Sequence, residues 1–311
     1  MDNLTHSLVG ALIGQAGLKR KTGLAMPALI IGANLPDVDV TCFAWTTGLE
    51  HLAFRRGITH GPPALVLLPL LLAGILWGFD RWQESRGKRP EGRLPVRFGW
   101  LFALAFIACL THPALDWMNV YGIRLLEPFS HRWFYGDVLF IIDIWLWIGM
   151  GLGLWLSLRR EKRGGDWRKV ARVTLAGVLA YIGVNAGVTW AAETARLDAP
   201  YLPGQIVIGS PPPAAFWHRD TIAGVPNNWW IRNPDSGVFE PITDRRCAWP
   251  DTDTLRQTNS QLDAFLFWSR APFAVRAEDG SVVLQDARYS GNSTFTLALP
   301  DVACEELSQQ D

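Results

Sequence analysis

The chain has 311 residues, of which 49% are hydrophobic, and its length is sufficient for two domains. Its formal net charge is zero, which argues against a nucleic-acid partner. The four cysteines have no C-x-x-C spacing, which argues against a cysteine-based zinc site or redox motif, and the N-terminus lacks the basic start and cleavage site of a signal peptide.

The first two-thirds of the sequence predict membrane helices. Two apolar runs, 4–18 and 24–35, are shorter than the roughly 20 residues of a full span. They predict short, tilted or broken helices, with re-entrant segments as the alternative. Longer apolar runs predict spanning helices over 64–79, 138–158 and 170–192, and a further run, 98–110, leads into a polar stretch.

The composition changes after Pro200, where Pro, Asp, Ser and Thr become frequent. Short alternating runs at 205–208, 265–268, 281–284 and 294–299 predict a mainly antiparallel β domain. The predicted fold class is therefore an α-helical polytopic membrane domain, residues 1–195, followed by a small, mainly-β soluble domain, residues 196–311.

Basic residues predict how the chain crosses the membrane. The segments 19–21, 80–97 and 159–172 are rich in Lys and Arg and should face the cytoplasm. Threading outward from them predicts a set of polar residues at the opposite face: His6, Asp37, Asp39, His60, His112, Asp116, His131 and Asp137. The C-terminal domain would then be extracytoplasmic, where a disulfide between Cys247 and Cys304 could survive, although no spacing rule pairs them.

The polar stretch 111–143 lies between two apolar runs, where ionisable side chains are costly unless something binds them. His112 and Asp116 are four residues apart, so a helix carried through them puts both side chains on one face. This spacing suits two ligands of one metal ion.

Three of the histidines follow a threonine: Thr5-His6, Thr59-His60 and Thr111-His112. Each hydroxyl could bond the backbone at a helix start while the imidazole projects into a shared cavity. The alternative is that each His is a satisfied polar residue at a membrane boundary. The three pairs, taken together with the nearby aspartates, favour a shared metal site.

Several aspartates leave two interpretations open. Asp37 and Asp39 follow Pro36, so an extended backbone would point both carboxylates to one side, whereas a turn or helix cap is the alternative. Asp137 could cap a helix that starts at Val138. Asp143 lies inside an apolar run and needs a polar partner, either a metal ligand that it supports or a neighbouring helix. His131, Asp137 and Asp143 are therefore supporting residues or additional ligands.

Arg56 is close in sequence to His60 and could neutralise a bound anion such as phosphate, the alternative being an arginine that reaches the lipid headgroups. Mixed His and Asp ligands favour Zn²⁺, with Mn²⁺ or Mg²⁺ as alternatives. The candidate ligands outnumber the four of one tetrahedral ion, so one or more ions could bind. We assign catalytic roles to Asp39, Arg56 and Asp116.

Five motifs resemble the bacterial inner-membrane metal-dependent hydrolases of the YbcI/YdjM type: Thr5-His6, Pro36-Asp37-Val38-Asp39, Arg56-Gly57-Ile58-Thr59-His60, His112-Pro113-Ala114-Leu115-Asp116 and Leu126-Glu127-Pro128-Phe129-Ser130. The resemblance covers residues 1 to about 195 and implies a distant likeness to zinc-dependent phospholipase C. It implies that His6, Asp37, Asp39, His60, His112 and Asp116 are metal ligands or neighbours of the ligands. Family members often have His where this chain has Arg55, so that ligand is absent here.

The sequence thus predicts a multi-pass inner-membrane hydrolase in which a metal-activated water attacks an ester or phosphoester, including a lipid, at the outer face of the membrane. The bilayer is its expected partner. The alternative is a non-enzymatic membrane protein with a structural metal and a partner-binding β domain. An ion transporter is the least supported class, because the last span offers mainly Asn185 and Thr189 as polar residues.

Overall fold

The computed structural model describes residues 1–195 and 202–305. The chain forms two compact units. The helical unit comprises Met1–Asp39, Arg56–Ala186 and Pro213–Phe216. The C-terminal unit comprises Val40–Arg55, Gly187–Pro212 and Trp217–Asp311.

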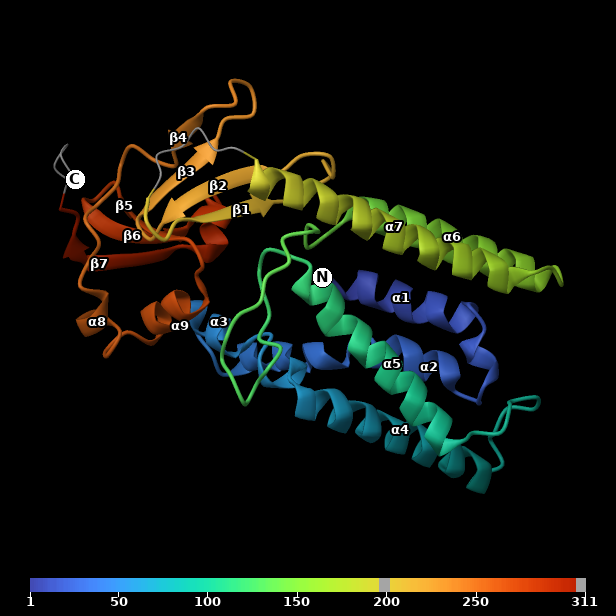
Figure 1. Cartoon of the computed structure of the whole chain (residues 1–311). Helices are drawn as coiled ribbons and strands as arrows, with labels where there is room; N and C mark the ends of the chain where they lie inside the picture. Colours follow the sequence, from blue (N-terminus) through green and yellow to red (C-terminus); the bar gives the residue numbers. More distant parts are fainter. Residues whose placement is uncertain (196–201, 306–311) are drawn as a thin grey trace. The chain divides into compact units, whose positions relative to one another are not determined.

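The helical unit is a bundle of antiparallel helices (Figure 1). Its helices are α1 (Asn3–Gln15), α2 (Ala25–Gly32), α4 (Pro62–Ser85), α5 (Phe98–Trp117), α6 (Ile144–Lys162) and the greater part of α7 (Trp167–Thr194). Short 3₁₀ helices, η1 (Leu18–Arg20), η2 (Leu35–Ala44) and η4 (Ile58–His60), connect them. With 13 and 8 residues, α1 and α2 are short, as predicted; α2 packs on α1 and α5, and α4 packs on α5.

Three helices in the described part of the chain are long and apolar enough to cross a membrane, namely α4, α5 and α7. The predicted span over 138–158 is wrong at its start, because α6 begins at Ile144 and the preceding residues are not helical. Helix α6 is not among the three candidate spans. Its last turn carries Arg159, Arg160 and Lys162, which lowers the hydropathy of a helix of only 19 residues.

The core of the bundle is built from small and branched apolar residues. Ala28, Leu29, Leu101, Leu104 and Ala105 are essentially inaccessible to solvent. Helix α2 approaches α5 so closely that a Cβ at residue 32 would lie 2.9 Å from the Ala105 carbonyl oxygen, which explains glycine there. This close contact holds the end of α2 against the middle of α5.

The C-terminal unit contains two antiparallel sheets, which with the helical unit confirms the predicted fold class. One sheet has the order β1 (Ile206–Ser210), β2 (Asp220–Val225), β3 (Asn228–Arg232), β4 (Phe239–Pro241), and the other has β5 (Pro272–Arg276), β6 (Ser281–Asp286), β7 (Leu297–Ala303). Short helices complete the unit: η3 (Gly48–Glu50), α3 (His51–Phe54), α8 (Thr252–Leu255), α9 (Ser260–Trp268), η5 (Ala287–Tyr289) and η6 (Ser293–Phe295).

The predicted strand at 265–268 is wrong, because these residues form the end of α9, where Leu262, Phe265 and Trp268 turn one helical face into the core. A second difference concerns residues 40–55. They follow the second apolar run in sequence, but η3 and α3 pack on α9 and belong to the C-terminal unit.

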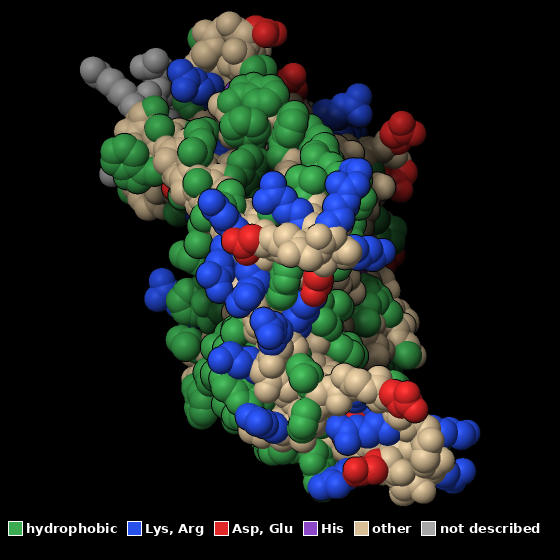
Figure 2. Space-filling model, turned by 90° about the vertical axis from the view of Figure 1, so that its right-hand side faces the viewer, with side chains coloured by type: hydrophobic (Ala, Val, Ile, Leu, Met, Phe, Trp, Pro, Cys, Tyr) green, Lys and Arg blue, Asp and Glu red, His purple; other side chains and the backbone are tan. Residues whose placement is uncertain are grey.

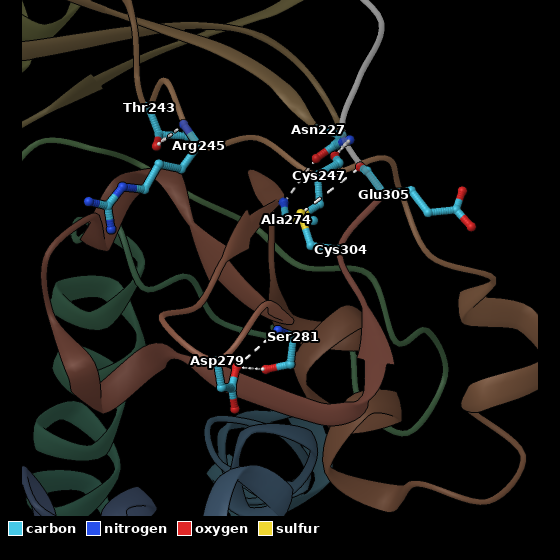
Figure 3. Close-up of a disulfide and its surroundings, with 9 residues drawn as sticks. All are labelled: Asn227, Thr243, Arg245, Cys247, Ala274, Asp279, Ser281, Cys304 and Glu305. Carbon is cyan, nitrogen blue, oxygen red and sulfur yellow. Dashed lines mark hydrogen bonds between the residues drawn. A yellow bond between two sulfur atoms is a disulfide. The ribbon is translucent and has the colours of Figure 1, made fainter.

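A disulfide joins Cys247 to Cys304, whose Cα atoms are 5.2 Å apart (Figure 3). Asn227, in the turn between β2 and β3, supports it: its Nδ2 donates to the Cys247 carbonyl at 3.0 Å, and its Oδ1 accepts from Ala274 N at 2.9 Å. Cys42 and Cys109 are buried and are not part of this disulfide. The cysteine pairing, which no spacing rule gave, is thus decided by the fold.

The two ends of the helical unit differ in charge. Lys and Arg side chains gather over the ends of the helices in Figure 2, where the segments 19–21, 86–97 and 159–168 connect α1 to α2, α4 to α5 and α6 to α7. Because neighbouring helices are antiparallel, the start of α1, the start of α4 and the end of α5 lie at the other end of the unit. The predicted site residues cluster at that second end.

Candidate metal centre

Four side chains from three elements converge at the end of the helical unit opposite to the basic connections. They are Asp37 of η2, His60 of η4, and His112 and Asp116 of α5. One potential ligand atom from each lies within 4.8 Å of every other. His60, His112 and Asp116 are fully buried. The i,i+4 spacing in α5 therefore does put both side chains on one face, with His112 Nε2 3.6 Å from Asp116 Oδ2.

Hydrogen bonds orient both imidazoles. The Nδ1 of His112 is 2.7 Å from the Ala33 carbonyl oxygen, an atom that can only accept, so Nδ1 carries the proton and Nε2 has a lone pair. His60 Nδ1 is 3.0 Å from the Thr59 hydroxyl and 3.6 Å from Asp39 Oδ2. The Nε2 atoms of both histidines are buried and make no hydrogen bond. The Nε2 of His112 therefore presents the nitrogen lone pair that a metal requires, and the Nε2 of His60 does so when its Nδ1 carries the proton toward Thr59 Oγ1 and Asp39 Oδ2.

Asp116 is the centre of the cluster. Its Oδ2 is 3.0 Å from Arg56 Nε and 3.6 Å from His60 Nε2. Its Oδ1 forms an ion pair with the α-amino group of Met1 and lies 3.4 Å from His6 Nε2. A fully buried carboxylate in such surroundings needs these partners, because an isolated buried charge is strongly unfavourable.

His6 adjoins the four-residue group without belonging to it. Its ring stacks on His112 with centroids 3.8 Å apart. Burial lowers the pKa of His6 below its ordinary value, against the opposing effect of Asp116, so the neutral imidazole is favoured. Burial likewise lowers the pKa of the Met1 α-amino group, although Asp116 opposes the shift. Asp116 and Asp37 oppose both shifts, and both carboxylates belong to the four-residue group.

Asp37 and Asp39 lie on the 3₁₀ helix η2, so neither the extended backbone nor a simple cap describes them. Residues i and i+2 of a 3₁₀ helix point in different directions, and the two carboxylates accordingly differ. Asp37 Oδ1 is 3.8 Å from His112 Nε2. Asp39 Oδ2 accepts from Arg56 N at 2.7 Å and lies beside Nδ1 of His60, on the side of the ring away from the cluster.

Arg56 is 4% exposed and is held by several contacts. Its Nη1 donates to Asn119 Oδ1 at 2.9 Å and to the Gly122 carbonyl at 3.3 Å, and its guanidinium lies 4.6 Å from the centre of the Tyr121 ring. Its backbone has φ +53°, a left-handed conformation that the Asp39 hydrogen bond to Arg56 N helps to hold. The arginine thus lies inside the cluster, rather than reaching toward headgroups.

The structure does not bring the remaining predicted residues into the four-residue group. His131 is largely exposed and bonds Glu127 at 2.9 Å, and Glu127 is itself buried. Asp137 is buried but does not cap α6. Asp143 is the residue that caps α6, accepting from Trp145 N and Leu146 N, and it also accepts from Tyr181 Oη of α7 at 2.9 Å.

The three threonines that precede histidines have three different partners. Thr5 donates to Asp2 Oδ2 at 2.6 Å, Thr59 contacts the His60 ring, and Thr111 donates to the Ala108 carbonyl within α5. The expectation of a common bond at helix starts is therefore wrong, even though the three imidazoles do converge: His60 and His112 have ring centroids 5.1 Å apart.

Sequence reasoning missed the α-amino group of Met1 as a partner of Asp116, and it gave no role to Asn119 and Tyr121, which hold Arg56. The contact of the Met1 α-amino group could not be predicted, because no sequence motif indicates where a terminal amine lies. Asn119 and Tyr121 do lie three and five residues beyond Asp116 in the polar stretch, and an Asn in that position is the signal that could have been used.

The donor set fits a divalent cation. Two imidazoles and two carboxylate side chains form a mixed nitrogen and oxygen site of the kind that binds Zn²⁺ or Mn²⁺. The buried Nε2 atoms lack hydrogen bonds, and the opposite ring nitrogens are held by a carbonyl, a hydroxyl and a carboxylate, the arrangement found around metal-binding histidines.

Comparisons with known proteins agree with this assignment of the membrane part. The family model described as YdjM inner membrane protein matches residues 1–191. The chain is also 29% identical over 141 residues to the uncharacterized protein YfhP of Bacillus subtilis strain 168, a match that covers 43% of this chain and 39% of YfhP. No solved structure matches the chain. With a family match over residues 1–191, three candidate membrane spans and a buried His/Asp cluster that could hold a metal, the chain belongs to the YdjM inner membrane protein family.

Proposed function

We propose that this protein is a membrane-bound, metal-dependent hydrolase of esters or phosphoesters. The observation that carries the proposal is the buried group Asp37, His60, His112 and Asp116, with its imidazoles fixed for metal binding and an arginine in contact with it. A bound divalent ion, Zn²⁺ in this proposal, would lower the pKa of a water molecule and polarise an ester or phosphoryl oxygen.

The protein groups would divide the remaining work. Asp39 and Thr59 keep the proton on Nδ1 of His60, and the Ala33 carbonyl does the same for His112. Arg56 uses Nε and Nη1 for contacts within the protein, and its guanidinium has two further N–H donors on Nη2 for negative charge that develops on the substrate. Asp37 would accept the proton of the attacking water, because it is the cluster carboxylate that also borders a surface groove.

That groove supports an amphiphilic substrate. It has a volume of about 390 Å³ and is lined by Ile30, Ile31, Leu35 and Val38 together with Asn3, Asn34 and Asp37. Ile31 and Val38 are 45% and 47% exposed, so the groove is an apolar surface that ends at a site carboxylate. An acyl chain would bury this apolar area while its ester or phosphoester lies next to Asp37.

We further propose that the site and the C-terminal unit are extracytoplasmic. The basic connections lie at the end of the helical unit opposite to the site, and basic segments are retained on the cytoplasmic side of membrane proteins. The disulfide between Cys247 and Cys304 supports the same orientation, because disulfides persist in oxidising compartments.

A structural metal site in a non-enzymatic protein is the second candidate, and the observation that favours it is the number of protein donors. If Asp37, His60, His112 and Asp116 all bind one tetrahedral ion, no position is left for water, which is the mark of a structural site. A protein of this class would keep its metal and hydrolyse nothing, and the C-terminal unit would then recruit a partner.

The test is metal analysis and a hydrolysis screen of the purified full-length protein with lipid and phosphoester substrates. His112→Ala and Asp116→Ala should each abolish both metal content and hydrolysis, because each removes a donor of the buried group. His131→Ala is the matched control, since His131 is exposed and bonds only outside the group. Retained metal and activity in both cluster variants would reject the assignment, and metal without any hydrolysis would favour the structural role.

A further inference from the structure

One end of the helical unit carries a large excess of positive charge. The segments 19–21, 80–97 and 159–172 together hold 16 Lys and Arg residues but only five Asp and Glu residues, an excess of 11 positive charges. They contain the connections from α1 to α2, from α4 to α5 and from α6 to α7, and Figure 2 shows basic side chains gathered over the ends of these helices. We refer to this surface as the basic end. The metal centre lies at the opposite end of the unit, so the proposed hydrolysis does not use these charges.

Tryptophan rings lie against basic side chains around the basic end. The Lys19 Nζ is 4.4 Å from the centre of the Trp167 ring, and the Lys21 Nζ is 5.0 Å from that of Trp100. Three guanidinium groups lie 5.2–5.6 Å from the ring centres of further tryptophans: Arg81 over Trp77, Arg86 over Trp82 and Arg159 over Trp155. Tryptophan and basic residues gather where a membrane protein crosses the lipid headgroups. Because α4, α5 and α7 are candidate spans, we expect the basic end at headgroup depth in the bilayer.

Two arginines of α7, Arg168 and Arg172, converge over Gly17, the residue between α1 and η1. Their four-residue spacing puts both side chains on one face of the helix. A Cβ at residue 17 would lie 3.4 Å from Arg168 Cδ and 3.7 Å from Arg172 Nη2, so both side chains lie over the same glycine. The Arg172 Nε also donates to the Ala16 carbonyl at 3.0 Å, which fixes this side chain against the end of α1. We refer to Arg168 and Arg172 as the arginine pair.

Protein carboxylates do not neutralise the arginine pair. In the described part of the chain, neither of its guanidinium groups lies within ion-pair distance of an Asp or Glu. The two carboxylates that precede the pair in sequence have other partners: Glu161 pairs with Lys19, and Asp166 accepts from Lys169 N at 3.3 Å. Like charges four residues apart on a helix destabilise it. An anion bound by both arginines would replace this repulsion with charge-assisted hydrogen bonds.

The position and the charge of the arginine pair select the anion. Both arginines are exposed in the first turns of α7, a candidate span, so phosphate groups of the bilayer are within their reach. The guanidinium fork matches the oxygens of a phosphate. A zwitterionic headgroup would bring its own ammonium group into the positive excess of the basic end, whereas clustered basic residues beside a membrane helix favour anionic lipids. We propose that the arginine pair binds the phosphate of an anionic phospholipid. The proposal rests on the candidate spans and not on the proposed hydrolase function.

The experiment measures lipid binding to the full-length protein in a neutral detergent. Short-chain phosphatidylglycerol, short-chain phosphatidylcholine and inorganic phosphate are each titrated by calorimetry. The main variant is Arg168→Gln/Arg172→Gln, and Arg168→Gln alone is a second variant that keeps the contact of Arg172 with α1. The matched control is Lys162→Gln/Lys169→Gln, which removes the same charge from exposed residues of the same basic end. A thermal melt of each variant checks that it is folded.

The wild type should bind phosphatidylglycerol more tightly than phosphatidylcholine. We expect the dissociation constant for phosphatidylglycerol to rise roughly tenfold or more in the arginine double variant, because charge-assisted hydrogen bonds are lost, to rise less in Arg168→Gln, and to change little in the lysine control. An equal loss in the lysine control would mean diffuse attraction and would overturn the site. The proposal also fails if the arginine double variant binds phosphatidylglycerol as tightly as the wild type, or if phosphatidylcholine binds equally well. Inorganic phosphate that binds through the arginine pair as tightly as the lipid would overturn the assignment to a phospholipid.

Discussion

Asp39→Asn separates two roles that the sequence could not distinguish. The sequence suggests Asp39 as a metal ligand, whereas its observed contacts are with Arg56 N at 2.7 Å and with the far nitrogen of His60 at 3.6 Å. An asparagine oxygen can still accept from Arg56 N. It removes the negative charge that favours the proton on His60 Nδ1, and with it a restraint on the ring.

The size of the effect follows from that geometry. Removing a carboxylate that supports a metal-binding histidine costs roughly 10- to 100-fold in metal affinity, or about 1.4–2.7 kcal/mol. Removing a ligand costs far more, because the remaining donors cannot complete the coordination. We therefore expect Asp39→Asn to bind metal at the wild-type stoichiometry with weakened affinity, while His112→Ala binds none.

The assay is metal content after purification, followed by competition with a chromophoric chelator. Asp244→Asn serves as the control, since it removes an exposed carboxylate of the C-terminal unit. The reasoning is refuted if Asp39→Asn loses its metal as completely as His112→Ala, which would make Asp39 a ligand, or if its affinity equals that of the wild type.

Three further predictions concern other parts of the chain. Arg56→Lys should lower the hydrolysis rate about 10²–10³-fold at unchanged metal content, measured by kinetics and metal analysis; an equal loss of metal would contradict the assigned role. Burial alone would raise the pKa of Asp286, but Arg288 and its hydrogen bonds hold that pKa below its usual value. The contribution of the Asp286 carboxylate to folding stability should therefore be complete above about pH 3.9 and should fade as the pH falls. Asp286→Asn should lower the free energy of unfolding by about 3–5 kcal/mol, which thermal unfolding measured at several pH values would show. Reduction of the Cys247–Cys304 disulfide, whose partners are 57 residues apart, should cost roughly 4 kcal/mol of unfolding free energy, and thiol labelling of intact cells should find both cysteines oxidised; free thiols would oppose an extracytoplasmic C-terminal unit.

Local sequence rules identified the part of the site that lies on one regular element. A four-residue spacing predicts one helical face whatever the fold, and His112 and Asp116 follow it in α5. Rules for residues outside regular helices failed more often. Asp143 rather than Asp137 caps α6, because the chain between α5 and α6 remains irregular for six residues beyond the predicted start.

The repeated Thr-His pairs predicted the convergence of the histidines correctly, but the role expected for the threonines was wrong. We expected one shared function for Thr5, Thr59 and Thr111, and each hydroxyl has a different partner. The histidines converge because the start of α1, the helix η4 and the end of α5 lie at the same end of the helical unit. That convergence depends on the packing of α1 on α5, of η4 on α4 and of α4 on α5, which no property of a Thr-His pair encodes.

The sequence by itself determined the membrane character, the β-rich C-terminal part, the two-residue pair on α5 and the identity of most candidate ligands, because hydropathy and periodicity are local properties. Only the tertiary structure decided that Asp39 supports His60, that Arg56 lies within the cluster, that residues 40–55 pack on α9, and that Cys247 pairs with Cys304. These are contacts between residues far apart in the chain, and their distances are fixed by packing rather than by spacing along it.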